Sequence, residues 1–180
     1  PEDLPPVEFD NAIFAVLQGA MSNLIHDFQW QSVKTRLQMW KESGGMDVLE
    51  GMWILATYRY PDYSFKDLKL EMDQLYYEVW PQMREEIHPM DQVKVLNAVI
   101  FDQLKFGPNT KNFHAANNSF INNVLTSKKG NPISLCVIYM WIAQKLGMPV
   151  YGVNLPNLFV LTNKQNGLQF YINVFNKGLI

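Results

Sequence analysis

The chain has 180 residues, of which 48% are hydrophobic, 13% aromatic and 18% charged, and its net charge is −2. This composition is typical of a globular protein and excludes intrinsic disorder and a coiled coil, and no apolar run approaches the roughly 20 residues of a membrane helix. The single cysteine, Cys136, excludes an internal disulfide and a multi-cysteine zinc site, so we expect no metal, no cofactor and a cytoplasmic location.

Charge divides the chain near residue 110. Residues 1–110 hold nine basic and seventeen acidic residues, whereas residues 111–180 hold six lysines, no arginine and no Asp or Glu. Such asymmetry can mark a nucleic-acid surface, but arginine is the usual bidentate partner of bases. We therefore expect no nucleic-acid partner. The missing carboxylates also mean that residues 111–180 cannot supply a catalytic acid or a carboxylate nucleophile.

Residues 1–110 are predicted to form an acidic, antiparallel helical bundle. Apolar residues recur at helical spacing through residues 30–42, 46–58, 64–79 and 93–104. Ser64, with Asp67 three residues later, is typical of a helix N-cap. Pro81 is expected to end or kink the helix that follows.

Residues 111–180 change from helical to strand periodicity. Asn117-Asn118-Ser119 is expected to cap a short helix, and Asn131-Pro132 predicts the start of a helix over residues 132–146 that Gly147 ends. Short β-branched or aromatic runs near 150–155, 159–162 and 169–175 predict strands.

The Asn166-Gly167 pair between the last two runs predicts a hairpin. The predicted class is therefore α+β, with a helical bundle at 1–110 and a helix plus a small antiparallel sheet at 111–180. Because the chain lacks an initial Met and stops shortly after the last predicted strand, we expect a fragment that is truncated at its C-terminus.

Six short sequence motifs between Asn118 and Gly178 resemble the SirB-type transglutaminase-like family, a branch of the superfamily that contains transglutaminases and papain-like proteases. They are Asn118-Ser119-Phe120-Ile121-Asn122 with Val124-Leu125, Gly130-Asn131-Pro132-Ile133-Ser134-Leu135, Leu146-Gly147-Met148-Pro149-Val150, Gly152-Val153, Pro156 with Phe159, and Tyr171-Ile172-Asn173 with Phe175-Asn176 and Gly178. Val95-Leu96-Asn97, Phe101 and Lys105-Phe106-Gly107 resemble the last helix of the family's upstream region. The resemblance implies a papain-like helix and sheet after residue 111.

In that superfamily a Cys near the start of a helix works with a His and an Asp from the following strands, as a thiolate needs a neighbouring imidazolium and an oriented imidazole. The family's Pro-Gly-His-Phe is Pro156-Asn157-Leu158-Phe159 here, so the histidine position is Leu158. The family's Ile-Asp-Pro-Phe is Ile172-Asn173-Val174-Phe175, so the acid position is Asn173. Leu158 cannot transfer a proton, and Asn173 has no imidazole to orient.

Cys136 lies near the expected nucleophile position, but it is about the fifth residue of its helix and has apolar neighbours. We expect a small buried hydrophobe rather than a nucleophile. His114 is the one histidine in residues 111–180 and the speculative base if Cys136 is catalytic; His26 and His88 are expected to be surface or capping residues.

The sequence therefore favours a catalytically degenerate transglutaminase-like protein that acts as a protein- or peptide-binding or regulatory module, with an apolar, uncharged cleft. The alternative is a cysteine peptidase, amidase or acyltransferase that uses Cys136 with a histidine recruited from elsewhere. A third possibility is a structural spacer. The partner is an unidentified protein or peptide in the first case.

Overall fold

The computed structural model describes residues 28–180. Its helices before residue 110 are α2 (Phe28–Glu42), α3 (Val48–Ala56), α4 (Phe65–Val79) and α5 (Pro89–Asn97), with a 3-10 turn η2 (Trp80–Gln82) and a π-helical segment η3 (Ala98–Gln103). After them follow β1 (Gly107–Pro108), η4 (Ala116–Ser119), α6 (Ile121–Ser127), β2 (Lys129–Gly130), α7 (Pro132–Lys145), β3 (Val150–Leu155), β4 (Leu158–Gln165), β5 (Leu168–Ile172) and η5 (Val174–Asn176). The described part of the chain is thus mixed helix and sheet, consistent with the predicted α+β class.

The helix starts follow the predicted capping residues. The Oγ of Ser64 accepts a hydrogen bond from the Asp67 N–H at 3.0 Å, where α4 begins. Helix α4 ends at Val79, directly before a 3-10 turn that contains Pro81. The imidazole of His88 accepts a hydrogen bond from the Met90 N–H at 3.2 Å, so this histidine caps α5, as expected.

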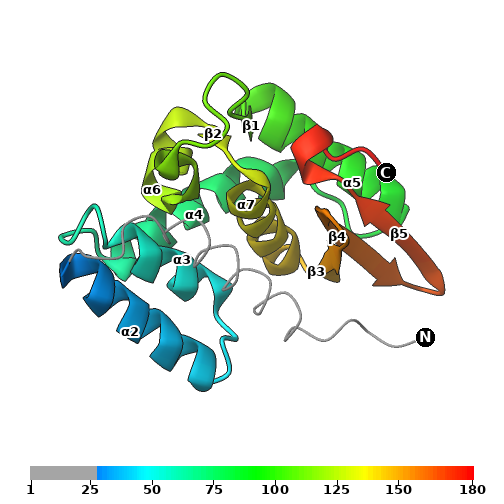
Figure 1. Ribbon diagram of the computed structural model, residues 1–180. Coiled ribbons are helices and arrows are strands. Elements are labelled where there is room, and N and C mark those ends of the chain that lie inside the picture. The colour runs from blue at the N-terminus through cyan, green and yellow to red at the C-terminus, as the bar shows by residue number, and fades with distance from the viewer. Residues whose placement is uncertain (1–27) are drawn as a thin grey trace.

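Helix α7 lies at the centre of the molecule. Helices α3, α4 and α6 contact it on one side, and strands β3 and β4 contact it on the other (Figure 1). Its residues Ile133–Met140 are all buried, and all of them except Ser134 belong to a hydrophobic cluster that also includes residues of α2, α3, α4 and α5. The position of α7 explains why its residues are apolar on every side.

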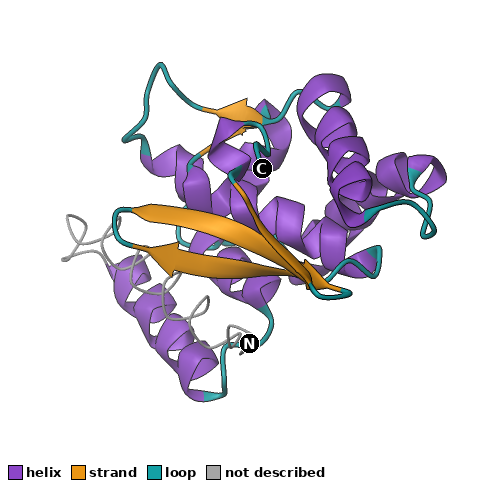
Figure 2. Cartoon of the chain, turned by 90° about the vertical axis from the view of Figure 1, so that its right-hand side faces the viewer, coloured by secondary structure: helices purple, strands orange, loops and turns teal. Residues whose placement is uncertain are grey.

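The sheet after α7 is antiparallel with the strand order β3-β4-β5, and its strands lie across the helices in Figure 2. Asn166 and Gly167 both have positive φ angles, +54° and +77°, as a two-residue hairpin of the predicted kind requires. The ladder extends to Gln165 and Leu168, and β4 is therefore longer than the predicted 159–162. The third strand ends at Ile172 instead of 175, because the Asn173 side chain caps η5.

The C-terminal end of the described chain is attached to α5. The Asn97 side chain donates a hydrogen bond to the Gly178 carbonyl at 2.9 Å and accepts one from the buried Tyr139 hydroxyl at 2.8 Å. Gly178 has a φ of +72°, and a Cβ there would overlap the Asn97 amide. Two of the segments that resemble the family, the one with Asn97 and the one with Gly178, therefore contact each other in the fold.

None of the helices in residues 28–180 combines the length and the apolar character that crossing a membrane would require.

Candidate functional site

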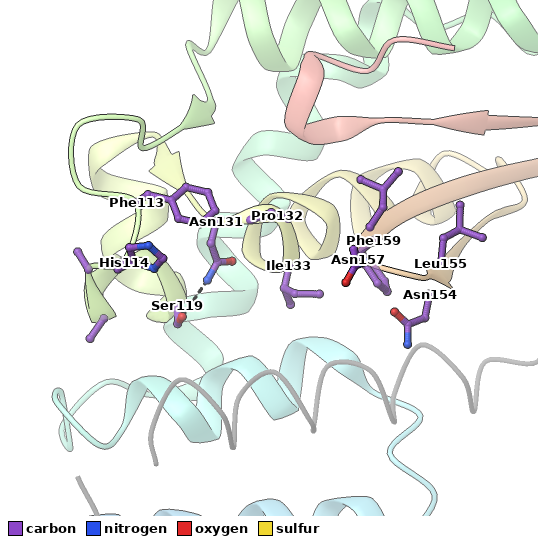
Figure 3. Close-up of a pocket in the computed structure, with 13 residues that line it drawn as sticks. Phe113, His114, Ser119, Asn131, Pro132, Ile133, Asn154, Leu155, Asn157 and Phe159 are labelled. Atoms are coloured by element: carbon purple, nitrogen blue, oxygen red, sulfur yellow. Dashed lines mark hydrogen bonds between the residues drawn. The ribbon is translucent and has the colours of Figure 1, made fainter. Parts of the chain in front are cut away.

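A cavity of about 490 Å³ opens at the N-terminal end of α7. Residues of three segments line it: 113–116 and Ser119 on one side, 131–133 at the start of α7 at its base, and 154–155 and 157–159 around the β3–β4 turn on the other side. Figure 3 shows His114 and Ser119 on one side of Ile133, and Asn154, Leu155 and Asn157 on the other. Segments far apart in the sequence therefore build one concave surface.

The base of the cavity is fixed by a capping box at the start of α7. Asn131 Oδ1 accepts a hydrogen bond from the Ser134 N–H at 2.8 Å, and Ser134 Oγ accepts one from the Asn131 N–H at 3.0 Å. Pro132 takes the first helical position, where no N–H is needed. Ser134 Oγ also lies 2.8 Å from the Asn118 carbonyl, to which it donates, so this helix start is connected to the cavity wall.

The wall at residues 109–119 is held by the side-chain amide of Asn118. Its Nδ2 donates to the carbonyls of Asn112 and Phe113, each at 2.9 Å, and its Oδ1 accepts from Asn109 Nδ2 at 2.9 Å. Asn118 was predicted to cap the following helix, but α6 begins after Phe120, which makes no side-chain cap bond. The Asn118 amide is buried and hydrogen-bonded within its own loop, so it is not available to cap the helix.

A second hydrogen bond joins this wall to the base. Asn131 Nδ2 donates to Ser119 Oγ at 2.8 Å, as the dashed line in Figure 3 shows. The Phe113 ring meets the rings of His114 and Phe175 edge-on, at 5.1 and 5.9 Å between ring centroids. The wall thus presents an aromatic ring that is 47% exposed, next to an exposed imidazole.

The opposite wall is the tight turn between β3 and β4. Leu155 pairs with Leu158, so only Pro156 and Asn157 lie between the strands. Proline fixes φ near −65° and Asn157 has a φ of +59°, which are the residue preferences of a type II turn. This turn presents Leu158, 45% exposed, to the cavity.

The described residues that line the cavity carry almost no charge. Apolar and amide side chains predominate, and none of the described lining residues is Asp, Glu, Lys or Arg. Leu158, which the resemblance places at the family's histidine position, lines the cavity with an apolar side chain. Such a surface can bind an apolar group and donate amide hydrogen bonds, but it offers no acid–base pair.

Cys136 lies elsewhere, in the interior of α7. Its side chain is completely buried and is not among the described residues that line the cavity, whereas His114 is exposed on the cavity wall. Burial raises the pKa of the Cys136 thiol well above its ordinary range, which opposes the thiolate that nucleophilic catalysis requires. In residues 28–180 no hydrogen bond joins the Cys136 sulfur to an imidazole.

The remaining sequence candidates also lie apart from a catalytic arrangement. Asn173 Oδ1 accepts a hydrogen bond from the Asn176 N–H at 3.2 Å, so its side chain caps η5. His88 caps α5, and His26 lies outside the described residues. Within the described range, no group of three or more His, Cys, Asp and Glu side chains is placed to hold a metal ion.

Sequence reasoning missed Phe113 and Ser134 as residues that shape the cavity. The signal for Ser134 was present, because an Asn at the N-cap and a hydroxyl three residues later form a capping box. No local pattern identifies Phe113, since its place in the wall depends on how the loop at 109–119 folds back toward α7.

Comparisons with known proteins support the superfamily to which the resemblance points. The family model described as transglutaminase-like superfamily matches residues 66–180. The mouse protein named F-box only protein 21 is 30% identical over 160 aligned positions, which cover 72% of this chain and 26% of the mouse protein. A UPF0162 protein of Xylella fastidiosa is 32% identical over 127 positions, covering 69% of this chain and 44% of that protein.

A UPF0162 protein of Vibrio cholerae is 24% identical over 136 positions, covering 75% of this chain and 50% of the relative. The chain thus spans half or less of the length of each of these curated relatives. No solved structure gives a significant match. Because the family model covers more than half of the chain, the chain belongs to the transglutaminase-like superfamily.

Proposed function

We propose that this chain is a catalytically degenerate, SirB-type member of the superfamily and that it works as a binding module. Its cavity at the N-terminal end of α7 would accept a peptide segment of a partner protein. The observation that supports the proposal is the cavity lining, to which Leu158, the residue that the resemblance assigns to the family's histidine position, contributes an apolar side chain. The cleft is thus open, but apolar side chains and amides predominate in it.

The size and lining of the cavity suit one or two side chains of an extended peptide. Its volume, about 490 Å³, lies within the range of ligand pockets. Phe113, Leu155 and Leu158 expose apolar surface in it, and the amides of Asn154 and Asn157 can pair with a peptide backbone. Exposed apolar side chains that are grouped in a concavity are typical of interaction sites.

The alternative enzyme would need Cys136 as a nucleophile, and its environment argues against that role. The sulfur is sealed in the core, and burial alone raises its pKa. Activation would need a nearby cation to lower the pKa instead. The names of the relatives given above name no enzyme either.

The proposal is tested by selecting short random peptides on immobilised protein and measuring their affinity for three forms of it. We expect the selected peptides to bind the unmodified chain and to bind Leu158→Asp at least about tenfold more weakly, because a carboxylate in the cavity resists desolvation by an apolar group. The matched control is Leu70→Asp on α4, since Leu70 is 52% exposed and lies outside the cavity. Leu70→Asp should bind as the unmodified chain does.

Two outcomes would contradict the proposal. Either no peptide is selected, or the selected peptides bind Leu158→Asp and the unmodified chain with equal affinity. In the second case the peptides would bind another surface.

A further inference from the structure

A second, smaller cavity of about 280 Å³ lies on the other side of the same wall. Every residue that lines it carries a polar side chain: Asn109, Asn117, Asn118, Asn123, Thr126, Ser127 and Lys129. The amides of Asn109, Asn118 and Asn123 and the hydroxyls of Thr126 and Ser127 already donate hydrogen bonds within the chain. The ammonium group of Lys129 is therefore the main group here that attracts an anion, and no described lining residue is acidic. The two cavities therefore differ in chemistry: the first suits an apolar group and the second an acidic one.

The 3-10 turn η4 separates the two cavities. Ala116 and Ser119 line the first cavity, whereas Asn117 and Asn118 line the second. A 3-10 helix has three residues per turn, so positions 116 and 119 share one side. The two cavities thus lie back to back across a single helical turn.

Lys129 is the cation of the second cavity, and it is exposed. In residues 28–180 the ion pairs are Lys94 with Asp91 and Lys145 with Asp73, so Lys129 takes part in neither. Its neighbour Lys128 is engaged differently, with its ammonium group 4.6 Å from the centroid of the Phe106 ring. Residues 111–180 contain no acid that could neutralise Lys129 within this part of the chain.

We infer that the peptide bound by this chain is acidic: it places an apolar side chain in the first cavity and an Asp or Glu carboxylate beside Lys129 in the second. This inference rests on the proposed function. The charge complementarity between the lysine-rich, acid-free half of the chain and an acidic peptide selects this occupant.

The positions of the two cavities also set how far apart the apolar and the acidic residue lie along the peptide. A helical turn with its side chains is roughly 10 Å across, and an extended peptide advances about 3.3 Å per residue. About three residues are therefore needed to cross η4. The expected ligand carries an apolar residue and an acidic residue about three positions apart.

The test uses the peptides selected above, each synthesised with its acidic residue and with the corresponding amide. At low salt we expect the Asp→Asn or Glu→Gln change to weaken binding to the unmodified chain about threefold, as exposed ion pairs do. With Lys129→Gln, the same peptide change should have no effect, because the partner charge is gone. Lys66→Gln, at an exposed position on α4, is the matched control and should behave as the unmodified chain. High salt should remove the difference.

The outcomes separate the two proposals. Selected peptides that share an apolar residue but no acid would overturn this inference and leave the binding module intact. If the Asp→Asn or Glu→Gln change weakened binding to Lys129→Gln and to the unmodified chain by the same factor, the inference would also be overturned, because the carboxylate would then bind elsewhere. Loss of all dependence on Leu158 would instead contradict the proposed function itself.

Discussion

The resemblance associates Cys136 and Leu158 with catalytic positions of the superfamily, and these two residues have opposite environments in this chain. Cys136 is fully enclosed in the core, among apolar neighbours, whereas Leu158 is 45% exposed in the wall of the cavity at the N-terminal end of α7. One residue is part of the core and the other is part of a surface. The difference separates the thiol that catalysis would need from the surface that binding would use.

The largest expected effect concerns the reactivity of Cys136. Iodoacetamide should alkylate the folded protein at least about a thousandfold more slowly than the denatured protein, because the thiol becomes accessible only when the structure opens. The rate in the folded protein should not show an inflection below about pH 8.5, since burial raises the pKa of this thiol. Because Cys136 is the only cysteine, mass spectrometry of the intact chain reports the reaction directly. Fast alkylation with a low apparent pKa would place Cys136 in an active site and remove the contrast with Leu158.

An aspartate at Cys136 and an aspartate at Leu158 test whether the first residue belongs to the core and the second to the surface. Cys136→Asp should lower the free energy of unfolding by about 3–5 kcal/mol, because it buries a carboxylate without a partner. Leu158→Asp should lower it by less than about 1 kcal/mol, since its side chain reaches solvent. Urea denaturation of both variants measures the difference. Equal losses would show that Leu158 is as much a part of the core as Cys136.

A smaller effect appears in the dependence of stability on pH. The thiol of the folded chain stays protonated, whereas that of the unfolded chain ionises above about pH 8.5. The folded pKa is the raised one, so this contribution to stability is complete below the unfolded pKa and is lost as pH rises. We expect the free energy of unfolding to fall by about 2 kcal/mol by pH 10.

The control for this dependence is Cys136→Ala, which lacks the thiol. Its stability should fall less steeply between about pH 8.5 and 10 than that of the unmodified chain. Denaturant titrations at several pH values measure both slopes. Parallel slopes would mean that the Cys136 thiol ionises in the folded protein as it does in the unfolded chain.

The smallest effect is expected at His114. His114→Ala should change the free energy of unfolding by less than about 0.5 kcal/mol, because the imidazole is exposed. It should leave the alkylation rate of Cys136 unchanged, since the exposed imidazole and the buried thiol are not hydrogen-bonded. A change in that alkylation rate would support the alternative in which His114 acts as the base for Cys136.

Features that depend on neighbouring residues were predictable from the sequence, and those that depend on distant contacts were not. Ser64 and Asn131 cap helices, and Asn166-Gly167 forms a hairpin turn, because each hydrogen-bonding or φ requirement is local. Asn118 has the same local preference, yet its amide is hydrogen-bonded to residues five to nine positions earlier in its own loop, which no short capping pattern indicates. Leu158 could be assigned to the cleft through the family resemblance alone. Phe113 could not, because its approach to α7 depends on a fold that brings separate segments together.

The hydrogen bonds of Asn118 have a further consequence for recognition. Its amide bonds with Asn109, Asn112 and Phe113 of its own loop, so the wall between the two cavities is already ordered before any ligand arrives. A preorganised wall spares the entropy that ordering a loop during association would cost. Association should therefore be close to rigid docking, with little change in backbone structure between the free and bound forms. Differences in affinity between ligands would then arise mainly from their dissociation rates.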